Sequence, residues 1–277
     1  MIAPAGEVDV AALHQGMASL QQLGFRVIVG KNVEKRYRYF AGADQERADD
    51  LLEMMRNPDV DAIICARGGS GSGRIIPYLT RINDPFPPKI FVGYSDITTL
   101  LLYLSRHFGF VTFHGPMVAT DFPTENLLRV LSGEMMTMRA PGVVALKDGT
   151  ADGILTGGCL SILCTTIGTS YEIDTDGTVL FIEDIAEPPY RIDRMLSYLK
   201  GLGKFDRIRG LIVGQMPGCN KEALPEIILE IFSDFEIPIL FDFPSGHGES
   251  LFTLPFGLPV CVNTMSRTVT MLAPAVI

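Results

Sequence analysis

Hydrophobic positions in the first half of the chain alternate between helical spacing and short continuous runs. Apolar residues recur at helical intervals within Val8–Leu23, and Gly24 ends that pattern. The same reading predicts helices over Asp44–Met55 and Ile97–His107, and strands over Phe25–Val29, Val60–Cys65, Lys89–Val92 and Phe110–Phe113. Strands that alternate with helices are typical of a parallel sheet covered on both faces.

The pattern changes over Asp121–Gly153, where prolines and turns surround a short predicted helix, Glu125–Leu131. Beyond it the elements are again α/β but less regular. We expect helices over Pro189–Leu202 and Lys221–Phe232, and strands over Val179–Glu183, Ile208–Val213, Ile237–Phe241 and Thr268–Ala273. The sequence therefore predicts two domains, residues 1–135 and 150–277, joined by a linker over 136–149.

The chain opens on Met1-Ile2-Ala3-Pro4, which resembles the end of a buried strand, so we expect a strand upstream of this start. The opening has no basic region, so we expect no secretory signal peptide. No apolar run reaches the length of a membrane-spanning helix. The five cysteines form no CxxC pair, which favours reduced, mostly buried thiols in a cytoplasmic protein.

Composition excludes several classes of protein. The 277 residues are 47% hydrophobic and 20% charged, which is globular rather than disordered or collagen-like. The net charge is −9, and the chain contains no basic run of the kind that binds nucleic acid. We therefore expect neither a nucleic-acid partner nor a membrane partner.

A glycine-rich segment, Ala66–Arg74, follows the predicted strand that ends at Cys65. Glycines let backbone N–H groups approach a ligand closely, although the spacing matches no phosphate-loop motif. Arg67 and Arg74 flank the glycines and favour an anion or carboxylate site, because a guanidinium grips such groups with two parallel bonds. The alternatives are a flexible turn and, for the arginines, an ion pair that fixes the loop.

Ser95 lies where a predicted strand runs directly into a predicted helix. Such a turn resembles a nucleophile elbow, which exposes a serine Oγ in front of the N–H groups of a helix N-terminus. The match to GxSxG is partial, because Ile97 stands at the last glycine position. The alternative is a simple helix N-cap.

Two further segments could complete a hydrolytic site. Glu183, Asp184 and Glu187 follow a strongly apolar strand, and a carboxylate there could orient a histidine or could merely stabilise a helix start. His114 and His247 are the candidate bases, and the glycines around His247 favour it. The cysteines and histidines lack the spacing of a zinc site, so we expect no metal.

Taken together and in this order, these segments resemble the LD-carboxypeptidase family, the serine peptidases of the S66 type. The resemblance runs over most of the chain. It rests on Ala66–Gly69, Gly93–Asp96, Gly115–Met117, Thr156–Ser161, Phe181–Asp184 with Glu187–Pro188 and Tyr190–Leu196, and Gly246-His247.

The resemblance implies an N-terminal Rossmann-like parallel-sheet domain that carries a nucleophile, Ser95. It implies a smaller C-terminal α/β domain, with barrel-like strands, that carries Glu183 as the acid and His247 as the base. The oxyanion hole would use backbone N–H groups of Asp96 and of the Gly68-Gly69 turn, with Gly69 as the donor. The family needs no cofactor. For substrate binding, our own hypothesis places Gly68 in the site and assigns the terminal carboxylate of the substrate to one of the two arginines, Arg67 or Arg74, because both flank the glycine turn.

The implied reaction removes the terminal D-Ala of the murein tetrapeptide during cell-wall recycling in the cytoplasm. Members of the family often form homodimers, which makes a homodimer an expectation by analogy. The chain departs from the family at Ser70, where an aromatic residue is common, at Cys159, where asparagine is common, and before His247, where Pro244-Ser245 lengthens the approach. These departures concern substrate binding more than the three implied catalytic residues.

Three alternatives remain at this point. One is hydrolysis of microcin C-type acyl-nucleotides, although such relatives are longer and often stack the base on a tryptophan, and this chain has no Trp. Another is a non-catalytic ligand-binding module built on the glycine-rich segment. The last is a family member that binds muropeptides without cleaving them.

Overall fold

The computed structural model of the chain describes residues 1–80, 86–120, 122, 124–248 and 251–276. The first half folds around a four-stranded sheet of order β1-β2-β3-β10. Its strands are β1 Ala62–Ile64, β2 Ile90–Gly93, β3 Thr112–His114 and β10 Leu254–Phe256. The first three are parallel, whereas β10 comes from the end of the chain and pairs antiparallel with β3.

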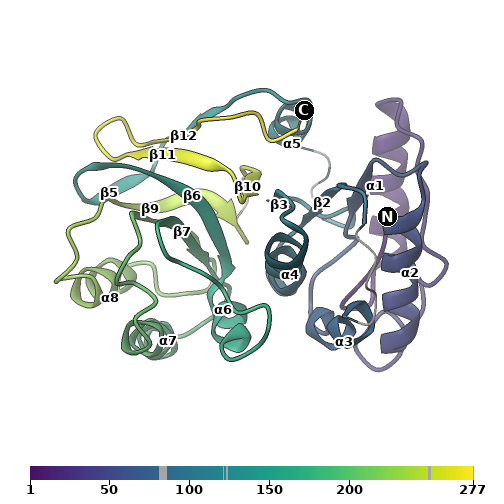
Figure 1. Ribbon diagram of the computed structural model, residues 1–277, viewed down its shortest axis with the longest axis horizontal. Coiled ribbons are helices and arrows are strands. Elements are labelled where there is room, and N and C mark those ends of the chain that lie inside the picture. Colours follow the sequence, from purple (N-terminus) through teal and green to yellow (C-terminus); the bar gives the residue numbers. More distant parts are fainter. Residues whose placement is uncertain (81–85, 121, 123, 249–250, 277) are drawn as a thin grey trace.

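Helices flank this small sheet as the alternating pattern predicts (Figure 1). They are α1 Val10–Gln22, α2 Asp44–Arg56, α3 Ile76–Leu79, α4 Thr98–Phe108 and α5 Glu125–Leu131. The Asp9 carboxylate caps α1 by accepting from the N–H groups of Ala11 and Ala12. The predicted positions of α1, α2, α4 and α5 are therefore confirmed to within a few residues.

The second half builds an eight-stranded sheet of order β4-β12-β11-β6-β7-β8-β9-β5. Its strands are β4 Thr137–Arg139, β5 Val144–Lys147, β6 Thr150–Cys159, β7 Thr178–Glu183, β8 Gly210–Gln215, β9 Ile239–Gly246, β11 Pro259–Asn263 and β12 Thr268–Met271. Strands β6 to β9 are parallel to one another. Segment 136–149, which the sequence suggests as a linker, contributes β4 and β5.

This larger sheet is strongly curled. Its two edge strands, β4 and β5, are joined by the five peptide steps from Arg139 to Val144, which reach at most about 18 Å. A flat sheet of eight strands would hold those edges about 34 Å apart. The sheet must therefore bend toward closure, in keeping with the barrel-like strands expected from the family resemblance.

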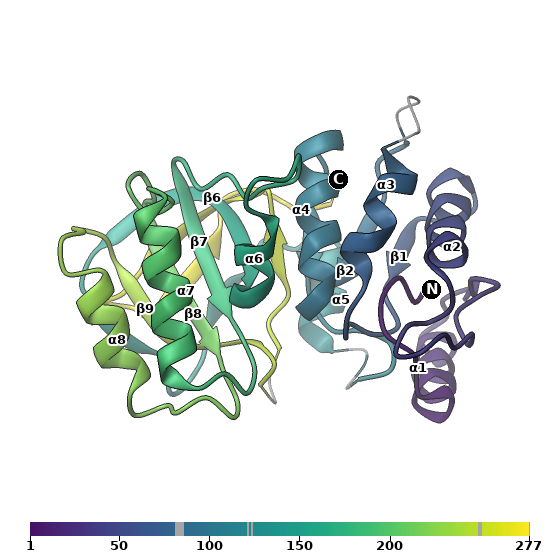
Figure 2. The same ribbon diagram turned by 90° about the horizontal axis from the view of Figure 1, so that it is seen from below.

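Three helices cover the outer face of the curled sheet (Figure 2). They are α6 Leu160–Thr166, α7 Pro189–Gly201 and α8 Leu224–Ile231. Their apolar faces enclose a core that includes Leu163, Leu196 and Ile228. A second core is continuous from the small sheet to the inner face of the large one, because it includes Phe113 on β3 and Phe181 on β7. Helix α4 lies between the two sheets (Figure 1).

One predicted strand is wrong: Phe25–Val29 forms no regular strand. Among the described residues, its sheet-like backbone bonds are limited to the neighbourhood of Met1. The Met1 nitrogen donates to the Ile28 carbonyl over 2.6 Å, and the Gly30 N–H donates to the Met1 carbonyl over 2.8 Å. An apolar segment needs a partner along its whole edge to become a strand, and this segment has one only at its end.

Candidate active site

Ser95 occupies a strained turn at the carboxyl end of β2. Its φ is +62°, a left-handed conformation that a residue other than glycine rarely adopts. A single 3₁₀ turn, Ser95–Ile97, follows and leads directly into α4. This strand–turn–helix geometry is the one that the sequence predicts, and the strain is typical of a nucleophile elbow.

The glycine-rich segment is tied to this turn by the side chain of Asp96. The buried Asp96 carboxylate accepts a hydrogen bond from the Ser72 N–H over 2.8 Å, and the Ser72 hydroxyl donates to the Asp96 carbonyl over 2.6 Å. On the other side, the buried guanidinium of Arg47 donates to the Gly71 carbonyl over 2.8 Å. The loop is therefore held from both sides, by contacts between distant segments that no local sequence pattern reveals.

Gly68 places the backbone of this loop directly against Ser95. A Cβ added at Gly68 would lie 2.9 Å from the Ser95 Cβ and 3.2 Å from its Oγ. No side chain fits in that space without displacing the serine. The Gly68 carbonyl also accepts from the Gly6 N–H over 2.9 Å, which anchors the turn to the first residues of the chain.

The structure brings Glu183 and His247 together. Glu183 ends β7 and is fully buried, and His247 follows the last residue of β9. The distance between His247 Nδ1 and Glu183 Oε2 is 2.6 Å. Both come from the carboxyl ends of parallel strands, where side chains of neighbouring strands converge.

Irregular pairing of β9 with β8 sets the position of His247. Across this pair the register shifts between Ile212 and Gln215, so β9 contains extra residues before it reaches Gly246. Gly246 has a φ of +110°, and a Cβ there would lie 2.8 Å from Glu183 Oε2. Sequence patterns do not reveal a bulge of this kind, which explains why the approach to His247 could not be predicted in detail.

Tyr94 connects the pair to the serine turn. Its ring lies edge-on to the His247 imidazole with 5.0 Å between ring centroids. Because Tyr94 directly precedes Ser95, the contact brings the serine turn next to the Glu183–His247 pair. No local pattern in the sequence assigns a role to Tyr94, because its contact with His247 joins residues that are distant along the chain.

The charge interactions of Glu183 and His247 are those of a carboxylate that raises the pKa of a neighbouring base. Burial raises the pKa of Glu183, although the hydrogen bond and charge of His247 act in the opposite direction. For His247, burial lowers the pKa, but the hydrogen bond and the charge of Glu183 outweigh it and raise the pKa above its usual 6.5. Glu183 thus stabilises the protonated imidazole.

The other candidate acids and the other candidate base have different partners. Asp184 accepts from the Ser161 N–H over 2.8 Å, and Glu187 lies 3.2 Å from the Arg191 guanidinium. His114 is fully buried beside Phe181, and neither of its ring nitrogens has a hydrogen-bond partner among the described residues. Burial lowers the pKa of His114 to about 3, so it stays neutral.

The two arginines that flank the glycines differ in their surroundings. Arg74 forms an ion pair with Asp44, with 2.7 Å between Nη2 and Oδ2 and two further contacts through Nε. This is the loop-fixing alternative that the sequence left open. Arg67 is exposed, and one of its nitrogens donates to the Glu7 carbonyl over 2.6 Å.

A close contact joins the two halves of the site. A Cβ added at Gly158 would lie 2.4 Å from the Thr98 Cγ2, so the end of β6 packs tightly on the first residue of α4. Beside it, the Cys159 N–H donates to the Thr98 hydroxyl over 3.2 Å. The sequence marks Gly157-Gly158-Cys159 as a motif, but only the fold shows that it meets α4.

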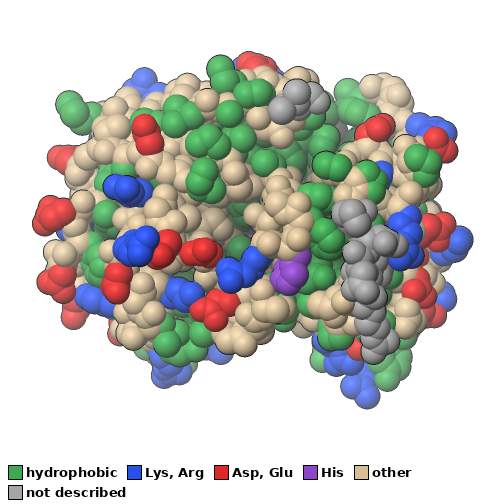
Figure 3. Space-filling model, viewed as in Figure 1, with side chains coloured by type: hydrophobic (Ala, Val, Ile, Leu, Met, Phe, Trp, Pro, Cys, Tyr) green, Lys and Arg blue, Asp and Glu red, His purple; other side chains and the backbone are tan. Residues whose placement is uncertain are grey.

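Surface charge, potential metal ligands and helix hydrophobicity do not change this description of the site. On the face shown in Figure 3, acidic and basic side chains are interspersed, without an extended field of one sign. Within the described ranges, no group of three or more His, Cys, Asp or Glu side chains is arranged to hold a metal ion. None of the helices in those ranges has the length and apolar character needed to cross a membrane.

Comparisons with known proteins agree with this architecture. The LD-carboxypeptidase N-terminal domain matches residues 1–115, and the LD-carboxypeptidase C-terminal domain matches residues 152–262. The probable murein peptide carboxypeptidase of Bacillus subtilis is 38% identical over 97% of this chain and 89% of its own length.

Two solved structures extend the comparison. The muramoyltetrapeptide carboxypeptidase from Oxalobacter formigenes superposes with a TM-score of 0.83 at 28% identity, covering 98% of this chain and 96% of the other. MccF in complex with glutamyl sulfamoyl guanosine gives 0.90 at 24% identity, covering 100% and 96%, and shares the fold. From the two domain matches and the Bacillus relative, the chain belongs to the LD-carboxypeptidase family.

Proposed function

We propose that this protein is a serine LD-carboxypeptidase that hydrolyses the amide between an L-centre and the terminal D-Ala of a murein tetrapeptide. The L-centre is that of meso-diaminopimelate or lysine, and the reaction belongs to cell-wall recycling. The observation that carries the proposal is the Glu183–His247 pair, 2.6 Å apart, beside the strained turn of Ser95. Murein carboxypeptidase relatives supply the substrate class.

In this proposal the Ser95 hydroxyl attacks the carbonyl carbon of the scissile amide while His247 takes its proton. His247 then returns the proton to the leaving D-Ala nitrogen, and water releases the acyl group from Ser95. Glu183 acts throughout on His247 Nδ1, where it fixes the imidazole tautomer and stabilises the cation that forms. The raised pKa of His247 is in keeping with that role.

The oxyanion would bind to the backbone N–H groups of Gly69 and Asp96. The Gly69 N–H donates to no acceptor among the described residues, and Gly68, just before it, lies against Ser95. Asp96 lies in the 3₁₀ turn that leads into α4, so its N–H belongs to a helix start. Removal of one such donor typically lowers the rate by about 10²–10³.

Of the two arginines, Arg67 is the better candidate for the terminal carboxylate of the substrate. Arg74 already holds a carboxylate, that of Asp44, in a multiply bonded pair. Arg67 uses one guanidinium nitrogen on a carbonyl and directly precedes Gly68. Its remaining N–H groups could bind a carboxylate close to the serine.

A second candidate is hydrolysis of acyl-nucleotides, and the sequence similarity to the microcin C7 self-immunity protein MccF of Escherichia coli, 27% identical over 96% of this chain, favours it. The complete absence of tryptophan from the sequence argues against it, because the base would lack that stacking partner. We place the enzyme in the cytoplasm, because all five cysteines are free. A homodimer remains an expectation from the family.

The test is mass spectrometry of purified protein incubated with L-Ala-γ-D-Glu-meso-Dap-D-Ala in the presence of EDTA. We expect the wild type to release one D-Ala and Ser95→Ala to release none, since the attacking oxygen is gone. An acyl-nucleotide serves as the competing substrate. Cleavage of that compound alone would replace the murein assignment, and turnover by Ser95→Ala would rule out the serine mechanism.

A further inference from the structure

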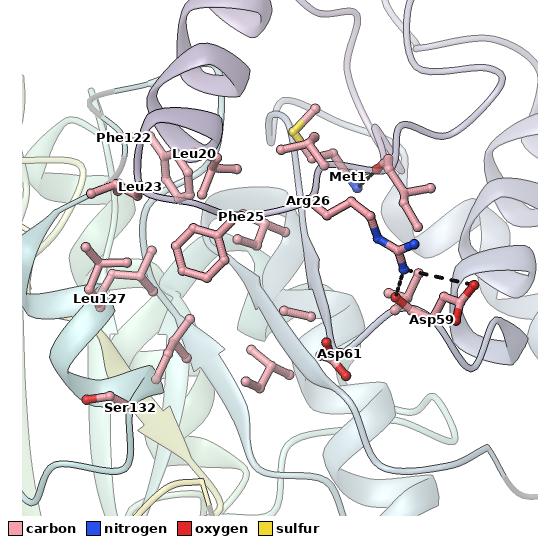
Figure 4. A pocket seen from close by; sticks show the side chains of 18 residues that line it. Met1, Leu20, Leu23, Phe25, Arg26, Asp59, Asp61, Phe122, Leu127 and Ser132 are labelled. Atoms are coloured by element: carbon pink, nitrogen blue, oxygen red, sulfur yellow. Dashed lines mark hydrogen bonds and ion pairs between the residues drawn. The ribbon is translucent and has the colours of Figure 1, made fainter.

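The proposed substrate carries more carboxylates than the site described so far would bind. In L-Ala-γ-D-Glu-meso-Dap-D-Ala, D-Glu and meso-Dap each carry a carboxylate besides the terminal one, for which Arg67 is the candidate. The largest apolar cavity of the described residues, about 580 Å³ in volume, offers no partner for them, because its one basic side chain, Arg26, is bonded to Asp59 (Figure 4). A partner for these inner carboxylates has to lie closer to Ser95, within reach of a bound tetrapeptide.

A tight hairpin turn lies beside the glycine-rich segment. Tyr37 and Phe40 exchange both of their backbone hydrogen bonds, each over 3.0 Å, so Arg38 and Tyr39 form an exposed tip. The ring of Phe40 is buried against the glycine-rich segment, where a Cβ added at Gly71 would lie 2.6 Å from the ring atom Cδ1. The hairpin is therefore packed directly on the segment that reaches the serine turn.

Gly6 and Glu7 connect the tip of this hairpin to the turn that faces Ser95. The Gly6 N–H donates to the Gly68 carbonyl over 2.9 Å, and the Glu7 N–H donates to the Tyr39 carbonyl over 3.2 Å. Because Gly68 contacts Ser95, the tip lies no more than two strand spacings, about 10 Å, from the contact with the serine. An extended peptide covers about 3.3–3.6 Å per residue, so this distance suits a carboxylate on a residue that precedes the terminal D-Ala.

Arg38 combines a strained backbone with a charge that no carboxylate neutralises. Its φ is +60°, a left-handed conformation that favours glycine at the first central position of such a turn. Its guanidinium lies over the Tyr37 ring, 5.3 Å from the centroid, and forms no ion pair with any described residue. The neighbouring Arg36, by contrast, lies 3.7 Å from the Glu7 carboxylate. Strain of this kind is typical of positions where a side chain serves binding at the expense of stability.

We propose that Arg38 is a specificity-determining residue that binds an inner carboxylate of the substrate, either that of D-Glu or the distal one of meso-Dap. The proposal rests on the murein tetrapeptide function proposed above and adds to it a second contact with the peptide. A planar guanidinium suits a carboxylate, because it donates two parallel N–H bonds. The Tyr37 ring covers one face of the guanidinium and leaves the N–H groups at its edge available for the ligand.

The experiment compares the wild type with Arg38→Gly and with the matched control Arg36→Ala. Glycine suits the left-handed backbone, so Arg38→Gly should unfold at the same temperature as the wild type or at a higher one. We nevertheless expect it to raise KM for the tetrapeptide about fivefold with kcat unchanged, as for an exposed, charge-assisted pair. Arg36→Ala removes the same charge from a residue that already has a carboxylate partner, so its KM should stay within about twofold of the wild type.

Two modified substrates identify the carboxylate. One has D-isoglutamine in place of D-Glu, and the other has Lys in place of meso-Dap, so each lacks one inner carboxylate. On the peptide that lacks the carboxylate bound by Arg38, the wild type and Arg38→Gly should have the same KM, whereas on the other peptide the fivefold difference should remain.

Three results would overturn the proposal: an unchanged KM of Arg38→Gly for the tetrapeptide, the same increase on all three substrates, or an equal increase in Arg36→Ala. The last would indicate a general effect of charge. These failures differ from a failure of the proposed function. A folded wild type that cleaves none of the three peptides would reject that function together with this inference.

Discussion

The hydroxyl of Thr98 accepts a hydrogen bond from the Cys159 N–H, 3.2 Å away, across the boundary between the two sheets. Thr98 lies three residues after Ser95, and Cys159 is paired with Glu183 in the register of β6 and β7. The bond therefore links the element that carries the serine to the strands that carry its proposed partners. Thr98 is fully buried, so water does not compete for this bond.

Replacing Thr98 by valine keeps the shape of the side chain and removes the acceptor. We expect kcat to fall about tenfold with little change in KM, because Ser95 and His247 would lose their fixed spacing. Thr98→Ser keeps the hydroxyl and should retain most of the activity. Steady-state kinetics of both variants, with thermal unfolding as a check on folding, provide the measurement. Equal kcat in the valine and serine variants would contradict a positioning role.

The contact between Gly68 and Ser95 predicts a second effect. Gly68→Ala would force a methyl group to within 2.9 Å of the Ser95 Cβ, so the serine or the loop must shift. We expect kcat/KM to fall by about 10² or more, in the range associated with loss of one oxyanion donor.

Gly73→Ala in the same loop is the matched control. A methyl group there would find its nearest neighbour at 3.7 Å, an ordinary contact, so activity should stay within about twofold. Parallel kinetics on the two variants separate a local effect on Ser95 from a general effect on the loop. If both substitutions lowered activity equally, the specific contact at Gly68 would not be the cause.

The Glu183–His247 pair predicts a pH dependence with a definite sign. The base must be neutral to accept a proton, and Glu183 raises its pKa above 6.5. Activity should therefore fall as the pH drops through that raised value, with the midpoint of the acid limb above 6.5. In Glu183→Gln, the hydrogen bond and charge of the carboxylate no longer raise the pKa of His247, whereas burial still lowers it. The acid limb of the profile should therefore move to lower pH.

The maximal rate of Glu183→Gln should also fall, by about 10³–10⁴, as when the carboxylate of a serine-protease triad becomes an amide. Profiles of kcat/KM from pH 5 to 9 for both proteins test the shift and the loss together. An acid limb at the same pH in both proteins would show that His247 is not the group that titrates.

Arg67 and Arg74, which flank the glycines, should respond differently to replacement by alanine. Arg67→Ala should raise KM for the tetrapeptide about tenfold and leave the unfolding midpoint unchanged. Arg74→Ala should leave KM nearly unchanged and lower the midpoint by no more than about 3 °C, since an exposed ion pair contributes little. Kinetics and thermal unfolding of the two variants distinguish the roles. A raised KM in Arg74→Ala alone would reverse the assignment.

Much of the fold follows from local pattern. The helices that contain Leu13, Leu101 and Leu196 have regular apolar spacing, so their positions could be predicted closely. The sequence pattern does not predict the short edge strands β4 and β5, because their residues are partly exposed and their partners are distant in the sequence. Phe25–Val29 is the opposite case, a segment that the pattern predicts as a strand but that forms none. An apolar run becomes a strand only with a partner along its edge.

The residues of the candidate site also differ in whether a local sequence pattern predicts them. Ser95 and the acidic strand end at Glu183 have local signatures, a strand–turn–helix and a strand that ends on carboxylates. The choice of Glu183 over Asp184 depends on which carboxylate reaches His247, and that is decided by long-range pairing. The roles of Asp96 and Thr98 rest on contacts between distant segments, which no local pattern contains.

The pairing of β10 with β3 has a consequence for the order of folding. Leu254–Phe256 complete the sheet that carries the serine turn, although that turn is synthesised more than 150 residues earlier. A nascent chain that stops before residue 254 exposes β3, which ends at His114, as an unpaired strand edge. During synthesis, the two halves of the enzyme therefore mature together, and the serine turn gains its final support only when the last strands leave the ribosome.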